Sequence, residues 1–209
     1  MSDPVQNACV LPGAVLLDKD GTLLDDVPYN VDPGRMRLAR GAAAALRDLG
    51  SLGVPLVVVT NQPGVAHGYH AEADLVPVRE RLAAMFAEHG ATLAGFYYCP
   101  HHPQGTVPAY MRACLCRKPM PGLLVQAASA LRFALGRSWM VGDILNDVEA
   151  GRRAGCGTVL VDCGNETEWQ LSPARLAHYV VPTLDAAARI VAARMRACGN
   201  VPAMQTVAP

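Results

Sequence analysis

The chain has 209 residues, of which 51% are hydrophobic and 17% charged, and its formal net charge is zero. This composition predicts a globular domain with enough length to bury a core. It provides no excess of Lys and Arg for nucleic acid or an anionic membrane surface, and the longest apolar runs are too short to span a bilayer. The N-terminal residues do not resemble a signal peptide. We therefore expect a cytoplasmic protein that binds neither nucleic acid nor membrane. A monomer is the expected oligomeric state, and neither net charge nor apolar content decides it.

In chain order, residues 1–12 are expected to be a flexible lead-in, and the apolar run at 14–17 predicts a buried strand. Residues 23–40 carry prolines and mixed charges without a clear period, which indicates a loop or flap beside the end of that strand. An Ala- and Leu-rich helix follows over 41–52, and a second buried strand follows over 54–60.

The next expected elements are an amphipathic helix over 72–89, with Pro77 near its first turn, and a third strand over 96–98. Residues 99–116 are rich in Pro, Gln, Gly and Thr, which argues against regular structure. The remaining chain is expected to form a helix at 121–135, a strand at 138–141, a helix at 145–154, strands at 157–161 and 178–181, a helix at 184–197 and a flexible tail at 199–209.

Strands that alternate with helices and are continuously apolar are typical of a parallel sheet with helices on both faces. We therefore predict a Rossmann-like, three-layer α/β fold with a single domain over 13–198. In such sheets ligands bind beyond the carboxyl ends of the strands. Polar residues follow three of the expected strands, at Asp18 and Asp20, at Thr60 and Asn61, and at Asp143. These side chains are expected to converge.

The first of these strands delivers two carboxylates, Asp18 and Asp20, into a turn that Gly21 permits. Crowded carboxylates repel each other unless a cation lies between them, and Mg²⁺ prefers such hard oxygen ligands. A calcium-binding EF-hand loop is excluded because its required Gly and Glu positions hold Leu23 and Tyr29. Asp18, Asp20 and Asp143 are the predicted Mg²⁺ ligands.

A carboxylate beside a bound cation can attack phosphorus and form an aspartyl-phosphate that water hydrolyses. Asp18 would attack, and Asp20 would act as general acid and then general base. Thr60 and Lys118 would contact the phosphoryl oxygens, and Asp147 would orient Asp143 from behind the metal. Taken alone, three of these residues have a structural alternative. Thr60 would cap a helix, Lys118 would be an exposed charge, and Asp147 would be an acid in the first turn of a helix.

Three of the seven cysteines lie close together in the irregular stretch, and Cys-x-His followed by Cys-x-Cys fills a tetrahedral structural Zn²⁺ site. By spacing alone, His101 and His102 compete for the histidine position. The other ligands are Cys99, Cys114 and Cys116. Zinc would hold the irregular stretch 99–116 in one conformation, so that Arg117 and Lys118 face the phosphate of the substrate. The remaining cysteines are interpreted as small buried or incidental residues: Cys9, Cys156, Cys163 and Cys198.

From Val15 to about Val161 the chain resembles the haloacid dehalogenase superfamily of phosphatases. The resemblance rests on four motifs in order: Asp18-x-Asp20-Gly21-Thr22, Thr60-Asn61, Lys118-Pro119 and Gly142-Asp143-x-x-x-Asp147. The stretches 97–105 and 114–119 are similar to the D-glycero-D-manno-heptose 1,7-bisphosphate phosphatases, with histidinol-phosphate phosphatases as near relatives. This resemblance implies no large cap domain, a catalytic Mg²⁺ and a structural zinc with His101 as its histidine.

The resemblance also implies hydrolysis of the C7 phosphate of that heptose bisphosphate, in the synthesis of lipopolysaccharide precursors. It assigns substrate binding to residues in three segments, namely Asp26, Tyr29, Asn61, Gln62 and Arg117. Two positions depart from the family: Ile144 replaces a Lys, and His67 stands where Gly-Ile-Ala-Arg-Gly has its Arg. The alternatives are a phosphatase of another small phosphomonoester, such as histidinol phosphate, and a non-catalytic zinc-stabilised binding protein.

Overall fold

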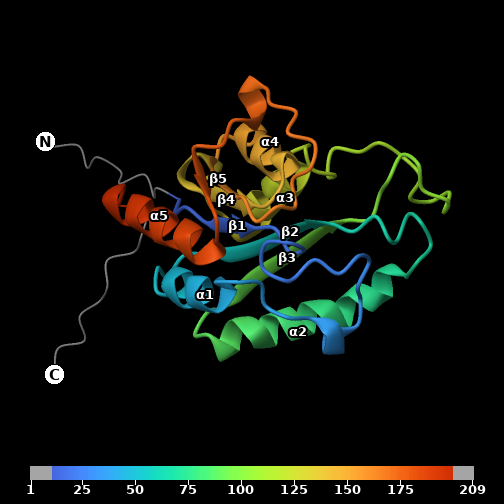
Figure 1. Cartoon of the computed structure of the whole chain (residues 1–209), viewed down its shortest axis with the longest axis horizontal. Helices are drawn as coiled ribbons and strands as arrows, with labels where there is room; N and C mark the ends of the chain where they lie inside the picture. The colour runs from blue at the N-terminus through green and yellow to red at the C-terminus, as the bar shows by residue number, and fades with distance from the viewer. Residues whose placement is uncertain (1–10, 200–209) are drawn as a thin grey trace, which may run out of the picture.

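The computed structural model describes residues 11–199, and Figure 1 shows one sheet between two layers of helices. All six strands are parallel, in the order β3-β2-β1-β4-β5-β6. Their bounds are β1 Val15–Leu17, β2 Leu56–Asn61, β3 Leu93–Cys99, β4 Trp139–Gly142, β5 Gly157–Val161 and β6 Tyr179–Val181. The predicted fold class is confirmed.

The helices divide between the two faces of the sheet (Figure 1). One core cluster joins the sheet to α1 (Ala42–Gly50), α2 (Leu75–Glu88) and α5 (Leu184–Ala197). A second cluster joins the other face to α3 (Gly122–Leu131) and α4 (Leu145–Arg153).

The central strand β1 illustrates why these residues form a buried sheet. Val15 and Leu17 belong to the first cluster and Leu16 to the second, and all three side chains have no exposed surface. Successive residues of a strand point to opposite faces, so a continuously apolar strand needs a helical layer on each side. Burying each leucine contributes about 2 kcal/mol. The strand is thereby fixed with its carboxyl end at one edge of the layers.

Three element boundaries differ from those predicted by three residues or more. The helix predicted over 72–89 begins at Leu75, because Glu72–Asp74 forms a separate 3-10 turn in which the Asp74 carboxylate accepts from the Ala71 N–H. The helix predicted over 121–135 ends at Leu131, where Arg132 takes a left-handed conformation with φ of 56°. The strand predicted over 96–98 starts earlier, at Leu93.

Residues 1–10 and 200–209, which carry most of the predicted lead-in and tail, lie outside the described residues, so the predicted domain boundaries stay predictions. Cys9 also lies there. Within residues 11–199, no helix is both long and apolar enough to cross a membrane.

Candidate active site

The carboxyl ends of three neighbouring strands supply the site. β1 lies between β2 and β4, so the residues that follow or end these strands meet at one edge of the sheet. Together with Lys118 and Asn165, which come from other segments, they surround a cavity of about 200 Å³. Its lining consists of Asp18, Asp20, Asp26, Thr60, Asn61, Lys118, Asp143, Ile144, Asp147 and Asn165. The structure therefore brings together the acids, the Thr and the Lys that the sequence analysis selects.

Lys118 is the charged centre of this cavity, and its ammonium group is buried. Its Nζ contacts the Asp18 carboxylate and lies 2.6 Å from Asp147 Oδ1. It also donates to the Val59 carbonyl at 2.9 Å. Burial alone would lower the pKa of Lys118, but the carboxylates of Asp147 and Asp18 outweigh it and raise that pKa above its ordinary value. Lys118 is thus a fixed cation that hydrogen-bonds to one carboxylate and one carbonyl and forms an ion pair with a second carboxylate.

Asn61 holds the Lys118 backbone in place. Its Nδ2 donates to the Lys118 carbonyl at 3.1 Å, and its Oδ1 accepts from the Lys118 N–H at 3.0 Å. This reciprocal pair ties the end of β2 to a residue 57 positions later. The side chain predicted to bind substrate therefore lines the cavity but uses its amide to position Lys118.

Three carboxylates, those of Asp18, Asp143 and Asp147, offer oxygen atoms that all lie within 4.8 Å of one another. Burial is the largest influence on Asp18 and raises its pKa to about 6, with Lys118 opposing and Asp147 adding to the rise. Burial, then the charges of Asp18 and Asp147, raises the pKa of Asp143 to about 7. One lysine offsets only part of this negative charge, so the donor set fits a divalent cation.

Asp147 is the residue that the sequence analysis places behind the metal. Its Oδ1 pairs with Lys118, and its Oδ2 accepts from the Ile144 N–H at 3.3 Å at the start of α4. Asp147 therefore both contacts the cluster of charged groups and caps a helix. Gly142 is required beside it, because a Cβ at position 142 would overlap the Asp147 side chain.

Asp20 lines the same cavity, but its carboxylate is outside the group of three. It accepts from Lys19 Nζ at 2.6 Å and from Gln62 Nε2 at 3.0 Å, and burial is the main cause that raises its pKa. Gln62 also donates to Thr60 Oγ1 at 3.0 Å. Gln62, predicted to bind substrate, thus connects Asp20 to Thr60 and orients both.

Sequence reasoning assigned no role to three residues that shape the site. Lys19 pairs with Asp20, while Thr22 Oγ1 and Asn165 Nδ2 donate to the Asp143 carboxylate at 2.6 and 2.8 Å. Thr22 lies within the first motif. Asn165 follows β5, so its place beyond the carboxyl end of a parallel strand was a usable signal.

An adjoining cavity of about 230 Å³ lies under the 23–40 segment and is lined by Asp20, Asp26, Val27, Pro28, Tyr29, Asn61, Gln62 and Pro63. Tyr29 packs edge-on against Tyr69, with ring centroids 4.7 Å apart. His67 stacks on Tyr69 at 5.7 Å and faces His102 at 4.7 Å. The predicted substrate residues Asp26 and Tyr29 thus line an outer chamber, and Tyr29 joins that chamber to a cluster of aromatic rings beside it.

Arg117 directly follows the irregular loop, and its charge interacts with Tyr29 of this chamber. Burial is the main cause that lowers its pKa, and its charge also interacts with His102. Its Nη1 is buried and has no hydrogen-bond partner within the described part of the chain. A buried guanidinium N–H without a partner is costly, so this group is suited to an anionic ligand.

The irregular loop carries the predicted metal ligands, and four of their atoms converge within 4.8 Å: Cys99, His101, Cys114 and Cys116. Cys116 Sγ lies 3.2 Å from the sulfurs of Cys99 and Cys114, and His101 Nδ1 lies 3.3 Å from it. His102 instead accepts from the Gln104 N–H through Nδ1. The geometry therefore selects His101 over His102, and the donor set suits tetrahedral Zn²⁺.

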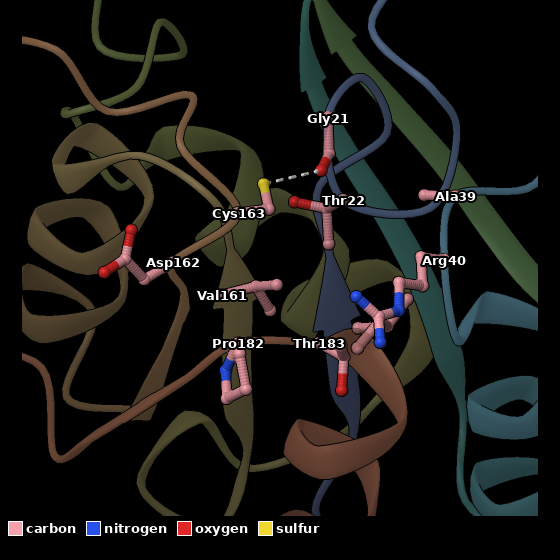
Figure 2. A pocket seen from close by; sticks show the side chains of 10 residues that line it. Gly21, Thr22, Ala39, Arg40, Val161, Asp162, Cys163, Pro182 and Thr183 are labelled. Carbon is pink, nitrogen blue, oxygen red and sulfur yellow. Dashed lines mark hydrogen bonds between the residues drawn. The ribbon is translucent and has the colours of Figure 1, made fainter.

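A larger cavity, of about 410 Å³, lies behind the Gly21–Thr22 turn (Figure 2). Its lining includes Arg40, Asp162 and Thr183 but none of the three clustered carboxylates. Cys163 Sγ lies 3.6 Å from the Gly21 carbonyl at its rim (Figure 2). Volume alone would select this cavity, but the convergent acids and Lys118 place the candidate chemistry in the smaller one.

Comparisons with known proteins agree with this geometry. The HAD-hydrolase-like family model matches residues 115–187. The chain is 40% identical over 168 residues to the D-glycero-beta-D-manno-heptose-1,7-bisphosphate 7-phosphatase of Escherichia coli strain K12, covering 76% of this chain and 88% of that protein.

Two solved structures share the fold. A HAD-like phosphatase from Mesorhizobium loti superposes with a TM-score of 0.79 at 30% identity, covering 94% of this chain and 90% of that one. The D,D-heptose 1,7-bisphosphate phosphatase from B. bronchiseptica, complexed with magnesium and phosphate, superposes with a TM-score of 0.70 at 27% identity. The match covers 86% of this chain and 97% of that one. The chain belongs to the haloacid dehalogenase-like phosphatase family, in the branch that contains the heptose-1,7-bisphosphate 7-phosphatases.

Proposed function

We propose that this protein is a Mg²⁺-dependent phosphatase that hydrolyses a phosphorylated sugar through an aspartyl-phosphate on Asp18. The observation that carries the proposal is the position of Asp18, which follows β1, contacts Lys118 and lies beside Asp143. The relatives named as heptose-bisphosphate 7-phosphatases support the reaction class.

In the first step an Asp18 carboxylate oxygen attacks phosphorus, and the bond from phosphorus to the sugar oxygen breaks. Asp20 gives its proton to the leaving oxygen. In the second step water attacks the phosphorus of the aspartyl-phosphate, Asp20 takes a proton from that water, and Asp18 and inorganic phosphate are released. Gln62 and Lys19 hold Asp20 in place for both proton transfers.

Asp18 and Asp143 would hold the Mg²⁺, with Asp20 as the third predicted ligand, and Thr22 and Asn165 orient Asp143. Bound there, Mg²⁺ supplies positive charge that offsets the charge of the carboxylates and of the phosphoryl oxygens. Lys118 adds a fixed charge to the same region, and Thr60 lines the cavity where the phosphoryl oxygens would lie. Asp147 keeps Lys118 charged and in position.

For the substrate we propose D-glycero-β-D-manno-heptose 1,7-bisphosphate, cleaved at C7 as in the named relatives. The outer chamber adjoins the catalytic cavity, and the charge of Arg117 interacts with Tyr29 of that chamber. The Arg117 Nη1, which has no hydrogen-bond partner within residues 11–199, suits a second phosphate. Asp26 and Tyr29 would contact the sugar. Ile144 in the catalytic cavity and His67, whose ring contacts Tyr29, remove or weaken the positive charge of the family's Lys and Arg.

We also propose that Cys99, His101, Cys114 and Cys116 bind a structural Zn²⁺. The four converging ligand atoms support this, and they leave no open position for catalysis. Cys114 Sγ accepts from the Arg117 N–H at 3.3 Å, so zinc would fix the residue just before Lys118. Because thiolate ligands require reduced cysteines, this site favours the predicted cytoplasmic location. Light scattering after gel filtration would test the predicted monomer.

The test is phosphate release by the purified protein with Mg²⁺ from heptose 1,7-bisphosphate, other sugar phosphates and histidinol phosphate. We expect kcat/KM for the heptose bisphosphate to exceed the others by more than about 100-fold, or roughly 2.7 kcal/mol. A flat profile, or a preference for histidinol phosphate, would remove the heptose assignment.

Asp18→Asn tests the chemistry separately. The variant keeps the shape of the side chain and should lose turnover while remaining folded. Asp162→Asn is the matched control, because it makes the same change at an exposed acid. Full activity of Asp18→Asn would overturn the mechanism, and an inactive wild-type protein that binds zinc would favour the non-catalytic alternative.

A further inference from the structure

The zinc-binding loop, residues 99–116, is attached to the domain by more than its four metal ligands. After Cys99, which ends β3, the loop consists of turns and bends up to Cys116. One attachment is to the backbone: the N–H groups of Thr106 and Val107 both donate to the Ala66 carbonyl, at 2.8 and 2.9 Å. A second attachment passes through side chains and centres on Glu72.

Glu72 lies in the 3-10 turn before α2, far from the loop in sequence, and its carboxylate accepts two tyrosine hydroxyls. Tyr98 donates to Oε2 and Tyr110 to Oε1, both at 2.7 Å. Each carboxylate oxygen therefore serves one tyrosine. Hydrogen bonds to a charged acceptor are roughly twice as strong as those between neutral groups.

The two tyrosines flank the metal ligands. Tyr98 directly precedes Cys99 on β3, and the Tyr110 ring lies 6.2 Å from the His101 ring. The Tyr110 carbonyl also accepts from the His102 N–H at 3.2 Å. Glu72 therefore joins the strand on which the loop begins to the middle of the loop, across the start of α2.

We propose that Glu72 is a positioning residue that holds the zinc-binding loop against the domain and slows the release of its metal. The metal part rests on the proposed zinc site. Partners that orient metal ligands typically change metal affinity by about 10- to 100-fold when they are removed. Because the loop leads directly into Arg117 and Lys118, the same contact limits how far these two residues can move.

The experiment compares the full-length wild-type protein with Glu72→Ala, Glu72→Gln, Tyr110→Phe and Glu80→Gln. Glu80 is an exposed acid on α2, so its variant removes the same charge away from the tyrosines. Two quantities are measured: the rate of zinc release to a chromogenic chelator, and hydrogen exchange of the His102 and Tyr110 amides. Circular dichroism verifies that each variant is folded.

We expect Glu72→Ala and Tyr110→Phe to release zinc about tenfold faster and to lose amide protection in the loop. Glu72→Gln should be intermediate, because its amide can still accept from one tyrosine. Glu80→Gln should match the wild type. Unchanged release and exchange in a folded Glu72→Ala variant, or equal acceleration in Glu80→Gln, would overturn the proposal.

If Glu72→Ala does not fold, the zinc release and amide exchange of Tyr110→Phe test the proposal, because this variant removes only one hydroxyl. Unchanged release and exchange in Tyr110→Phe would then overturn it. If the wild-type protein contains no zinc, the proposed metal site fails. The role of Glu72 in holding the loop is then judged by hydrogen exchange alone, and unchanged exchange refutes it.

Discussion

Replacing Asp143 with Asn should stabilise the Mg²⁺-free protein while abolishing its activity. Burial and two neighbouring carboxylates raise the pKa of Asp143 from 3.8 to about 7. A carboxyl group whose pKa is raised on folding destabilises the folded state above that pKa, and the cost disappears as the pH falls from 7 to 4. The difference between the two pKa values corresponds to about 4 kcal/mol at pH 8.

The substitution also has a cost. The amide nitrogen introduced at position 143 would face Asn165 Nδ2, which now donates to the Asp143 carboxylate, so about 1 kcal/mol is lost. The net gain is about 3 kcal/mol at pH 8, or roughly 6 to 12 °C in Tm. At pH 5 the carboxyl is protonated in the folded protein, and the gain should fall below about 1 kcal/mol.

The assay is thermal unfolding at pH 8 and pH 5 in Mg²⁺-free buffer, followed by circular dichroism. Asp48→Asn is the control, because it removes an exposed carboxylate from α1. Adding Mg²⁺ should raise the Tm of the wild type more than that of Asp143→Asn. A variant that is less stable than the wild type at pH 8, or a gain that does not depend on pH, would refute the electrostatic argument.

Two further predictions concern a turn and an ion pair. Gly21→Ala should lower kcat/KM by about 100-fold, because φ is 84° and the new Cβ would overlap the Asp143 carboxylate. Gly53→Ala, with φ of 65° and open space around it, controls for strain, and equal activity of both variants would contradict the clash. Glu149→Gln should cost about 1 to 2 kcal/mol at pH 7, measured by urea unfolding. Burial opposes ionisation of Glu149, but hydrogen bonds from Arg175 and Arg153 outweigh burial and lower the pKa of Glu149. The difference in unfolding free energy between the wild type and Glu149→Gln should therefore vanish as the pH falls below that pKa. A difference that stays constant with pH would contradict this prediction.

The sequence was sufficient for features that depend on local pattern. Continuous apolar runs predicted each strand of the sheet, and the rule that ligands lie beyond the carboxyl ends of parallel strands placed Asp18, Thr60 and Asp143 together. The four ligands of the proposed zinc site followed from spacing and resemblance, and the fold brings them within 4.8 Å. Their role stays a prediction.

Features that depend on pairing between distant segments could not be predicted. The Asn61 amide is used by the Lys118 backbone, and nothing in either segment indicates this bond. The end of α3 at Leu131 was also not predictable, because the left-handed residue that follows a helix is usually Gly or Asn and is here Arg132. Glu72 resembles any first-turn acid until the two tyrosines are seen beside it.

The strand order has a consequence for how the protein folds. β1 is paired with β2 on one side and β4 on the other, and the site also joins segments that are distant in sequence. Asp18 contacts Lys118, 100 residues later, and Thr22 contacts Asp143, 121 residues later. Such distant pairings close late and make folding slow. No early fragment of the chain, as it leaves the ribosome, contains a complete site. Phosphatase activity therefore requires that the central strand has already acquired both of its neighbours.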